Sequence, residues 1–470
     1  MEQKSEKYIR MTTAPVQGLI CKLAVPTIVS MLVTALYNIA DTFFVGQIGT
    51  EATAGVGLVF PIMTIIQAFG FFFGQGSGNY ISRSLGARKH DRAAYMAATG
   101  GVCAFLFGCA ILGFGLGFRG AVLRLIGART DLVSALTVSH ASSYLSLILF
   151  GAPFMCLSCV LNNQMRFQGN AFFSMIGLVS GAVLNVVLDP ILIFGAKMGV
   201  AGAALATSLS QAVSCLLLYL GTLRSDSLKL RLRNFRPTPY YLKNIVIGGV
   251  PSLCRQGLAS IATLCLNAAA GSAVEPALAD AAIAAFSVVS KIMMLAFSAL
   301  IGFGQAFQPV CGFNYGAAKY ERVRSAYVFC LRVGCTFLLV MSGVGFAFAD
   351  KLVALFRDDP NVIAFGTVAM RCQCCTFALM GLVTITNMLY QNIGRVVGAT
   401  LLAVARQGLM FIPVVLILPH LFSEHIWGVY LAQPTADLFA FGLALPLALR
   451  MYRELQARES AQELYTDDES

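Results

Sequence analysis

Three acidic residues lie deep inside apolar stretches of this 470-residue sequence. Among its 22 Asp and Glu residues, only Asp41, Asp189 and Asp437 fall well within such runs. A carboxylate at the depth of a lipid bilayer costs a few kcal/mol or more, so it is retained where it has a function or a fixed partner. These three positions are therefore the first candidates for chemistry.

Two of the three acids share a helix face with an asparagine. Asn38 and Asp41 are three residues apart, and Asn185 and Asp189 are four apart, which are the spacings of neighbours on a helix surface. Pro190 follows at once, and because proline has no N–H, the carbonyl four residues earlier loses its helical partner. Carboxylates, an amide and a free carbonyl together supply oxygen ligands.

The positions along the apolar runs place these groups at similar depth. Asp41 lies about five residues and Asp189 about six before their runs end, and Thr207 lies about nine after its own run begins, at roughly 1.5 Å per residue. Two carboxylates, an amide and a hydroxyl there could bind Na⁺ or hold a proton. The alternative is a structural polar cluster that ties three helices together.

The second half of the chain differs from the first. Asp437 suits a packing contact in the last helix as well as a functional role, and Ile412 stands where the first half has Asp189. The pairs Arg255-Gln256 and Arg406-Gln407 could face a cavity, with structural hydrogen bonding or extension of the arginines toward the helix ends as the alternative. Four basic residues interrupt the apolar runs here: Arg255, Lys291, Arg371 and Arg406.

Composition indicates that lipid surrounds most of the chain. Hydrophobic residues make up 57% and charged residues 12%, about half the charge of a soluble domain. The continuous runs suit all-α spans rather than barrel strands, which alternate over about ten residues. Twelve runs are long enough to cross a membrane: 19–45, 53–80, 94–118, 132–160, 170–195, 198–222, 244–270, 281–308, 325–348, 362–389, 396–419 and 426–449.

The net charge of +11 is explained by the loops and not by nucleic-acid binding. With the N-terminus inside, 22 Lys and Arg residues fall in inner segments and 6 in outer ones, which places both termini in the cytoplasm. The 14 cysteines lack nearby histidines at metal-ligand spacing, so no metal site is expected beyond a Na⁺ ion with the two carboxylates.

The chain repeats itself, which predicts two homologous halves with one topology. Four pairs of motifs recur in register: Gly74-Gln75 through Arg92 with Gly304-Gln305 through Arg322, Pro26 with Pro251, Pro190 with Pro413, and Gln168 with Gln391. We expect a cytoplasmic segment at 1–18, an N-lobe of six helices at 19–222, a basic cytoplasmic linker at 223–243, a C-lobe of six helices at 244–450, and a charged, disordered cytoplasmic tail at 451–470. Repeats of this kind place a substrate site near mid-membrane where they meet.

At this point the sequence resembles the multidrug and toxic compound extrusion (MATE) family, in its DinF-like bacterial branch. The resemblance covers roughly residues 15–450. It is carried by the twelve-helix duplication, the paired loops that begin at Gly86 and Gly316, and two runs: Ala40-Asp41-Thr42-Phe43-Phe44-Val45-Gly46 and Leu188-Asp189-Pro190-Ile191-Leu192-Ile193-Phe194-Gly195.

This resemblance implies two six-helix bundles that form a V in the bacterial cytoplasmic membrane. It implies export of amphipathic, mostly cationic small molecules by H⁺- or Na⁺-coupled antiport with alternating access, without a further cofactor or an obligate protein partner. The family's cation site maps to Asp41, Asn185, Asp189 and Thr207. The expected substrate path comprises Tyr37, Asn38, Asn162, Asp437, Arg255 and Gln407.

Three other classes compete with this interpretation. A lipid-linked oligosaccharide flippase of the related superfamily would use paired bundles, but often with fourteen helices and a strongly cationic cavity. A channel or receptor would not need depth-matched carboxylates in one half. An enzyme would need a catalytic constellation, and the sequence contains none that we recognise.

Overall fold

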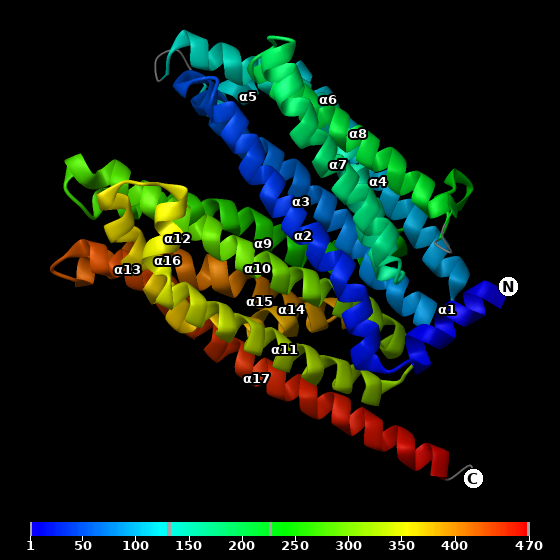
Figure 1. Ribbon diagram of the computed structural model, residues 1–470. Coiled ribbons are helices and arrows are strands. Elements are labelled where there is room, and N and C mark those ends of the chain that lie inside the picture. The colour runs from blue at the N-terminus through cyan, green and yellow to red at the C-terminus, as the bar shows by residue number, and fades with distance from the viewer. Residues whose placement is uncertain (1, 129–132, 225–227, 468–470) are drawn as a thin grey trace. The chain divides into compact units, whose positions relative to one another are not determined.

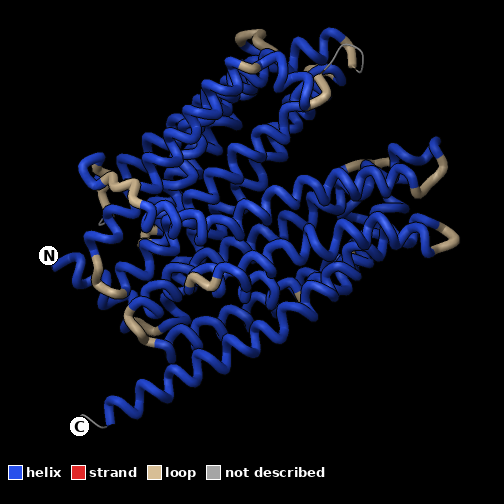
Figure 2. The backbone as a smooth tube through the Cα atoms, turned by 180° about the vertical axis from the view of Figure 1, so that it is seen from behind, coloured by secondary structure: helices blue, strands red, loops and turns tan. Residues whose placement is uncertain are grey.

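The computed structural model describes residues 2–128, 133–224 and 228–467, and these residues form helices joined by short loops, without strands (Figure 2). One of the six basic residues expected in outer segments, Arg129, lies outside the described ranges, as do residues 225–227 of the expected linker and the last three residues of the tail. The all-helical fold predicted from the sequence is confirmed.

The first half contains the six predicted spans and three short helical elements outside them. Its π-helical segment η1 directly follows Pro190, where the proline interrupts the α-helical hydrogen bonds. The elements are α1 (Glu2–Thr13), α2 (Val16–Gly46), α3 (Thr50–Gly86), α4 (His90–Gly117), α5 (Arg119–Leu125), α6 (Ala135–Phe167), α7 (Ala171–Pro190), η1 (Ile191–Gly195), α8 (Val200–Arg224) and η2 (Leu232–Asn234).

The second half contains the other six spans, one of them broken. The predicted tenth run is split into α13 and α14, which meet at 55°. Among the described residues, eleven helices are long and apolar enough to cross a membrane, or twelve with this bent pair. The elements are α9 (Pro239–Ser272), η3 (Pro276–Leu278), α10 (Ala279–Gly316), α11 (Tyr320–Ala347), α12 (Ala349–Phe356), α13 (Pro360–Phe377), α14 (Met380–Ile393), α15 (Val396–Val404), η4 (Ala405–Met410), α16 (Phe411–Ile417), η5 (Leu418–Leu421) and α17 (His425–Asp467).

The chain forms two compact units, and α2 and α9 each belong to both. The first unit comprises residues 1–10 and 29–253, and the second comprises 11–28 and 254–470. The change of unit lies two residues after Pro26 in α2 and two after Pro251 in α9. A proline inside a helix removes one backbone hydrogen bond, so both helices are weakened just before they change unit.

Backbone hydrogen bonds confirm the repeat at the level of individual turns. The turn after α3 has a 2.8 Å bond from Lys89 to Ser84, and the turn after α10 has the same bond from Lys319 to Asn314, which is the offset of 230 found in the sequence. Arg88 and Ala318 take positive φ angles of 57° and 60° in these turns.

The turns that follow α6 and α14 revise one sequence match. The Asn162 amide donates to the Ser174 carbonyl, and the Asn387 amide donates to the Ala399 carbonyl, so both pairs give an offset of 225. At this offset Gln391 corresponds to Arg166. Its predicted match with Gln168 at an offset of 223 is therefore wrong, because the two glutamines occupy different positions in their turns.

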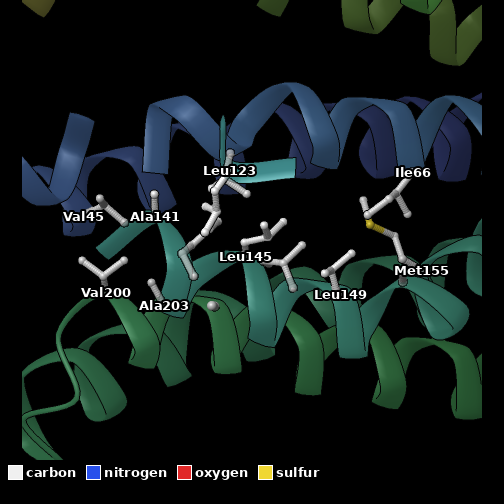
Figure 3. Close-up of a cluster of buried hydrophobic side chains, with 14 of the residues drawn as sticks. Val45, Ile66, Leu123, Ala141, Leu145, Leu149, Met155, Val200 and Ala203 are labelled. Atoms are coloured by element: carbon white, nitrogen blue, oxygen red, sulfur yellow. The ribbon is translucent and has the colours of Figure 1, made fainter. Parts of the chain in front are cut away.

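In the first unit, α6 is the central helix and packs against α3, α4, α7 and α8 (Figure 1). Its apolar side chains Leu145, Leu149 and Met155 belong to one buried core with Ile66 of α3, and Met155 points toward Ile66 (Figure 3). Gly108 of α4 lets α6 approach closely, because a Cβ there would lie 2.5 Å from the Cα atom of a proline in α6. The core also includes Ala203 and Ala204 of α8, and α7 packs against both α6 and α8, so these three helices form the frame of the site below.

The C-terminal tail is helical where disorder was expected. Helix α17 continues to Asp467, and ion pairs attach its polar end to neighbouring helices. Arg324 of α11 holds Glu459 at 2.8 Å, and Arg395 pairs with Glu454. The sequence prediction failed because it judged the charges by composition alone, whereas their signs match those of partners far away in the sequence.

Candidate cation and substrate site

The end of α7 and the first half of α8 bring three of the four predicted cation ligands together. Asn185 and Asp189 are one helical turn apart on α7, and the Asn185 Nδ2 atom donates to Asp189 Oδ1 at 3.4 Å. The same Nδ2 atom donates to the Thr207 hydroxyl on α8, also at 3.4 Å. Asn185 is 2% exposed and Asp189 is fully buried. The amide therefore links the carboxylate and hydroxyl that the sequence had placed at one depth.

Several buried acceptor oxygens of this cluster lack a donor among the described residues. They are Asp41 Oδ1, Asn185 Oδ1 and Asp189 Oδ2. An ionised carboxylate can only accept hydrogen bonds, and buried polar atoms in folded proteins nearly always have a partner. Three such oxygens in one cluster are therefore suited to a proton or a metal cation that binds and leaves.

Asp41 approaches the cluster from α2. It is close enough to Asp189 for the two carboxylates to interact electrostatically, and both also interact electrostatically with the side chains of Tyr37 and Tyr144. The described residues contain no group of three or more His, Cys, Asp or Glu side chains that could hold a metal ion. Cation binding here would therefore depend on the amide and hydroxyl oxygens beside the two carboxylates.

A cavity of about 220 Å³ lies beside the cluster, within the first unit. It is bounded by α2, α3, α6, α7 and α8, and it includes the predicted path residues Tyr37, Asn38 and Asn162 together with Asn185 and Thr207. Asp41 and Asp189 are not among its lining residues. The structure therefore places the amide and hydroxyl at the cavity wall, with the carboxylates behind them.

One path residue has a structural partner. The amide of Asn162 donates to the Ser174 carbonyl at 3.1 Å, and the Ser174 hydroxyl donates to the Asn162 carbonyl at 3.2 Å. Asn162 therefore joins α6 to α7 and also contributes to the cavity wall.

The sequence analysis missed several polar residues of the cavity wall. Ser210 and Ser214 of α8 line it together with Thr207, and the Ser210 hydroxyl is buried without a partner in the described chain. These hydroxyls recur at intervals of three and four residues, so the signal was a polar stripe on one helix face. Thr34, Gln67, Ser158 and Gln211 complete the polar lining.

The remaining path residues lie in the second unit and do not form one site. Asp437 is 2% exposed and forms an ion pair with Arg406, with 3.2 Å between Nε and Oδ1. Gln433 donates to the same carboxylate at 2.8 Å, and Thr376 donates at 3.5 Å. Within the described ranges, neither Arg255 nor Gln407 has a recorded hydrogen bond or ion pair with Asp437.

Comparison with known proteins identifies the family. The MatE family model matches residues 26–191 and 257–417, well over half of the chain and parts of both halves. The chain belongs to the MATE family. It is accordingly a multi-pass membrane transporter and not an enzyme.

Individual relatives agree over nearly the whole length of the chain. The multidrug export protein MepA of Staphylococcus haemolyticus is 26% identical over 95% of this chain and 97% of its own. MepA of Staphylococcus aureus (strain NCTC 8325) is 26% identical over 93% of this chain and 95% of its own. An outward-facing multidrug resistance MATE transporter of the MOP superfamily is 27% identical, covers 96% of this chain and 98% of its own, and has a TM-score of 0.89.

Proposed function

We propose that this MATE transporter exports amphipathic organic compounds, mainly cations, across the bacterial cytoplasmic membrane in exchange for H⁺ or Na⁺. The observation that carries the proposal is the set of unpaired buried oxygens of Asp41, Asn185 and Asp189 beside a polar cavity. The names of the relatives, which are multidrug export proteins, support the substrate class.

The chemistry of coupling follows from the burial of the two acids. An incoming H⁺ or Na⁺ neutralises a carboxylate of Asp41 or Asp189, which lowers the cost of keeping it away from water. An ionised pair instead attracts an organic cation to the adjoining cavity, so ion and substrate favour opposite states of the cluster. Two ligands that favour different states exchange with one another by shifting the population between them.

The distribution of basic residues supports the orientation. The excess of Lys and Arg on the side of both termini predicts that both lie in the cytoplasm. In this orientation the cluster lies in the outer half of the membrane, so the coupling ion reaches it from outside when the transporter faces outward.

The test is ethidium movement in everted vesicles that carry the full chain. An imposed pH gradient is compared with an imposed Na⁺ gradient for the native protein, Asp41→Asn and Asp189→Asn. Asp350→Asn is the matched control, because Asp350 is an exposed acid at the start of α12. We expect movement under one gradient, lost in both cluster variants and retained in the control.

Two other results would contradict the proposal. Movement that survives both Asp41→Asn and Asp189→Asn would reduce the cluster to a packing element. No movement under either gradient, with the protein correctly inserted, would favour a lipid flippase, for which the basic residues of the second unit are the supporting observation.

A further inference from the structure

The second unit contains an arginine whose position is fixed but whose binding edge is free. The Nε atom of Arg406 contacts Asp437, and its guanidinium lies over the Phe297 ring, 4.7 Å from the ring centre. Phe297 in turn contacts Phe377, with 6.3 Å between ring centres. The aromatic contact and the ion pair together hold the guanidinium plane in one orientation.

Both carboxylate oxygens of Asp437, the buried partner of Arg406, accept hydrogen bonds. Arg406, Gln433 and Thr376 all donate to the Asp437 carboxylate, so both of its oxygens have donors. By contrast, the two Nη groups of Arg406 have no recorded partner in the described part of the chain, and the side chain is 19% exposed. The pair therefore leaves the outer edge of the guanidinium, with two parallel N–H directions, open to a ligand.

The position of Arg406 along its apolar stretch indicates what the Nη edge of its guanidinium faces. The residue lies in the π-helical segment η4, close to the middle of the apolar stretch Val396–Leu421. A guanidinium at mid-membrane depth faces the protein interior or a watery path and not lipid. Interruptions of this kind in a helix are also frequent at functional sites.

The charge of the second unit favours an anionic ligand. Asp437 neutralises Arg406, but Arg255 lies in the middle of α9 and has no recorded ion pair or hydrogen bond within the described ranges. Lys291 on α10 is likewise without a recorded partner there. The Nη groups of Arg406 can only donate hydrogen bonds, so a carboxylate can pair with them whereas an organic cation cannot.

We propose that the Nη edge of Arg406 binds the carboxylate of transported zwitterionic amphipaths. A planar guanidinium held at Nε matches a carboxylate through two parallel hydrogen bonds, and the half-buried Phe297 ring beside it provides an apolar surface for the rest of the molecule. This inference rests on the proposed export function and assigns to Arg406 the selection of carboxylate-bearing substrates.

The test uses two dyes that differ at one group. Rhodamine 110 carries a free carboxylate beside its cationic ring system, and rhodamine 123 is its methyl ester. Gradient-driven transport of both is measured in phosphatidylcholine proteoliposomes for the native chain and for Arg406→Gln/Asp437→Asn, which removes both charges and leaves no unpaired ion. Arg371→Gln is the matched control, since Arg371 is an exposed arginine of the same unit that lies over Phe346.

We expect the native protein and Arg371→Gln to move both dyes. The double variant should move rhodamine 123 like the native protein, while its rhodamine 110 transport falls about tenfold or more, as expected for the loss of a charged hydrogen-bond pair. Arg406→Lys, which keeps the charge but not the fork, should show the same selective loss to a smaller extent.

Other outcomes overturn the inference in distinguishable ways. Equal effects on both dyes, or no rhodamine 110 transport by the native chain, would exclude a carboxylate site at Arg406 while leaving cation export intact. No transport of either dye would remove the proposed function itself. If the dependence on Arg406 vanishes in vesicles that also contain phosphatidylglycerol, a lipid phosphate occupies the edge and the substrate assignment is wrong.

Discussion

The two units treat buried charge in opposite ways. In the first unit, Asp41 and Asp189 keep carboxylate oxygens without a donor beside a polar cavity. In the second, the only acid deep in the apolar runs, Asp437, has three donors, one of them the cation Arg406. Under the proposed function, the first arrangement takes up a cation from outside, whereas the second already contains one in Arg406. A duplicated fold can therefore restrict ion exchange to one copy by supplying the other with its own counter-ion.

The same distortion accompanies both arrangements. The fifth span of the first half contains η1 directly after Asp189 and Pro190, and the eleventh span contains η4 around Arg406. A π-helical turn widens the helix and alters the direction of the side chains near it. At the repeat offsets of 223 to 225, η4 corresponds to residues 180–187, which precede η1, so the two distortions occupy different positions of the repeated span.

The largest expected effect separates the units by coupling. Asp189→Asn should abolish gradient-driven ethidium movement, because the neutral amide no longer exchanges a cation. Arg406→Gln/Asp437→Asn should retain it, because the second unit binds no coupling ion. Transport in everted vesicles measures both. Loss of coupling in the second variant, with the protein still inserted, would contradict the division of roles between the units.

The next effect separates the units by stability. Arg406→Gln leaves Asp437 buried beside uncharged donors only, so we expect unfolding to become easier by about 3–5 kcal/mol. Asp41→Asn should cost much less, because its Oδ1 atom has no donor to lose. Thermal unfolding in detergent compares the two, and Arg406→Gln/Asp437→Asn serves as the control that should recover most of the loss. An equal loss for both single variants would refute the distinction.

A smaller effect tests the ligands around the acids. Asn185→Ala removes the amide that joins Asp189 to Thr207, and Thr207→Val removes the hydroxyl but keeps the shape. Each should weaken half-saturation by the coupling ion about five- to tenfold, since a hydrogen bond or ligand of this kind contributes about 1 kcal/mol. Transport rates as a function of ion concentration give the values. Ser260→Ala, on α9 in the second unit, should leave them unchanged.

The smallest effect shows that burial, and not the mere presence of an ion pair, matters in the second unit. Glu459→Gln breaks the partly exposed pair with Arg324 near the C-terminal end of α17. We expect a loss of about 1 kcal/mol or less, as for other surface pairs. The same unfolding assay measures it, and a loss as large as that of Arg406→Gln would show that the tail contacts are more important than their exposure suggests.

Much of the first unit could be predicted from the sequence, for a geometric reason. Helix periodicity and membrane thickness together fix the depth and face of Asn185, Asp189 and Thr207, so three residues on two helices can be matched without coordinates. The unpaired oxygens could not be predicted, because they depend on which donors the neighbouring helices present. The roles of these residues as ion ligands remain a prediction for the transport assay.

The second unit shows where such reasoning ends. Arg406 and Asp437 are 31 residues apart on different helices, and several basic side chains compete for one acid. Nothing in the sequence ranks Arg406 above Arg255 as its partner. The bend between α13 and α14 could not be predicted from the sequence either, because the two residues at the break, Ala378 and Leu379, are not prolines.

The exchange of α2 and α9 between the units has a consequence for the origin of the molecule. Each unit is completed by the opening turns of a helix that continues in the other, with the switch two residues beyond Pro26 and Pro251. A half-length ancestor with the same exchange would therefore form each compact unit from two identical chains, as in a domain-swapped dimer. Gene fusion would have joined the two copies in one chain. If the chain is cut between α8 and α9, we expect activity only when both fragments are synthesised together.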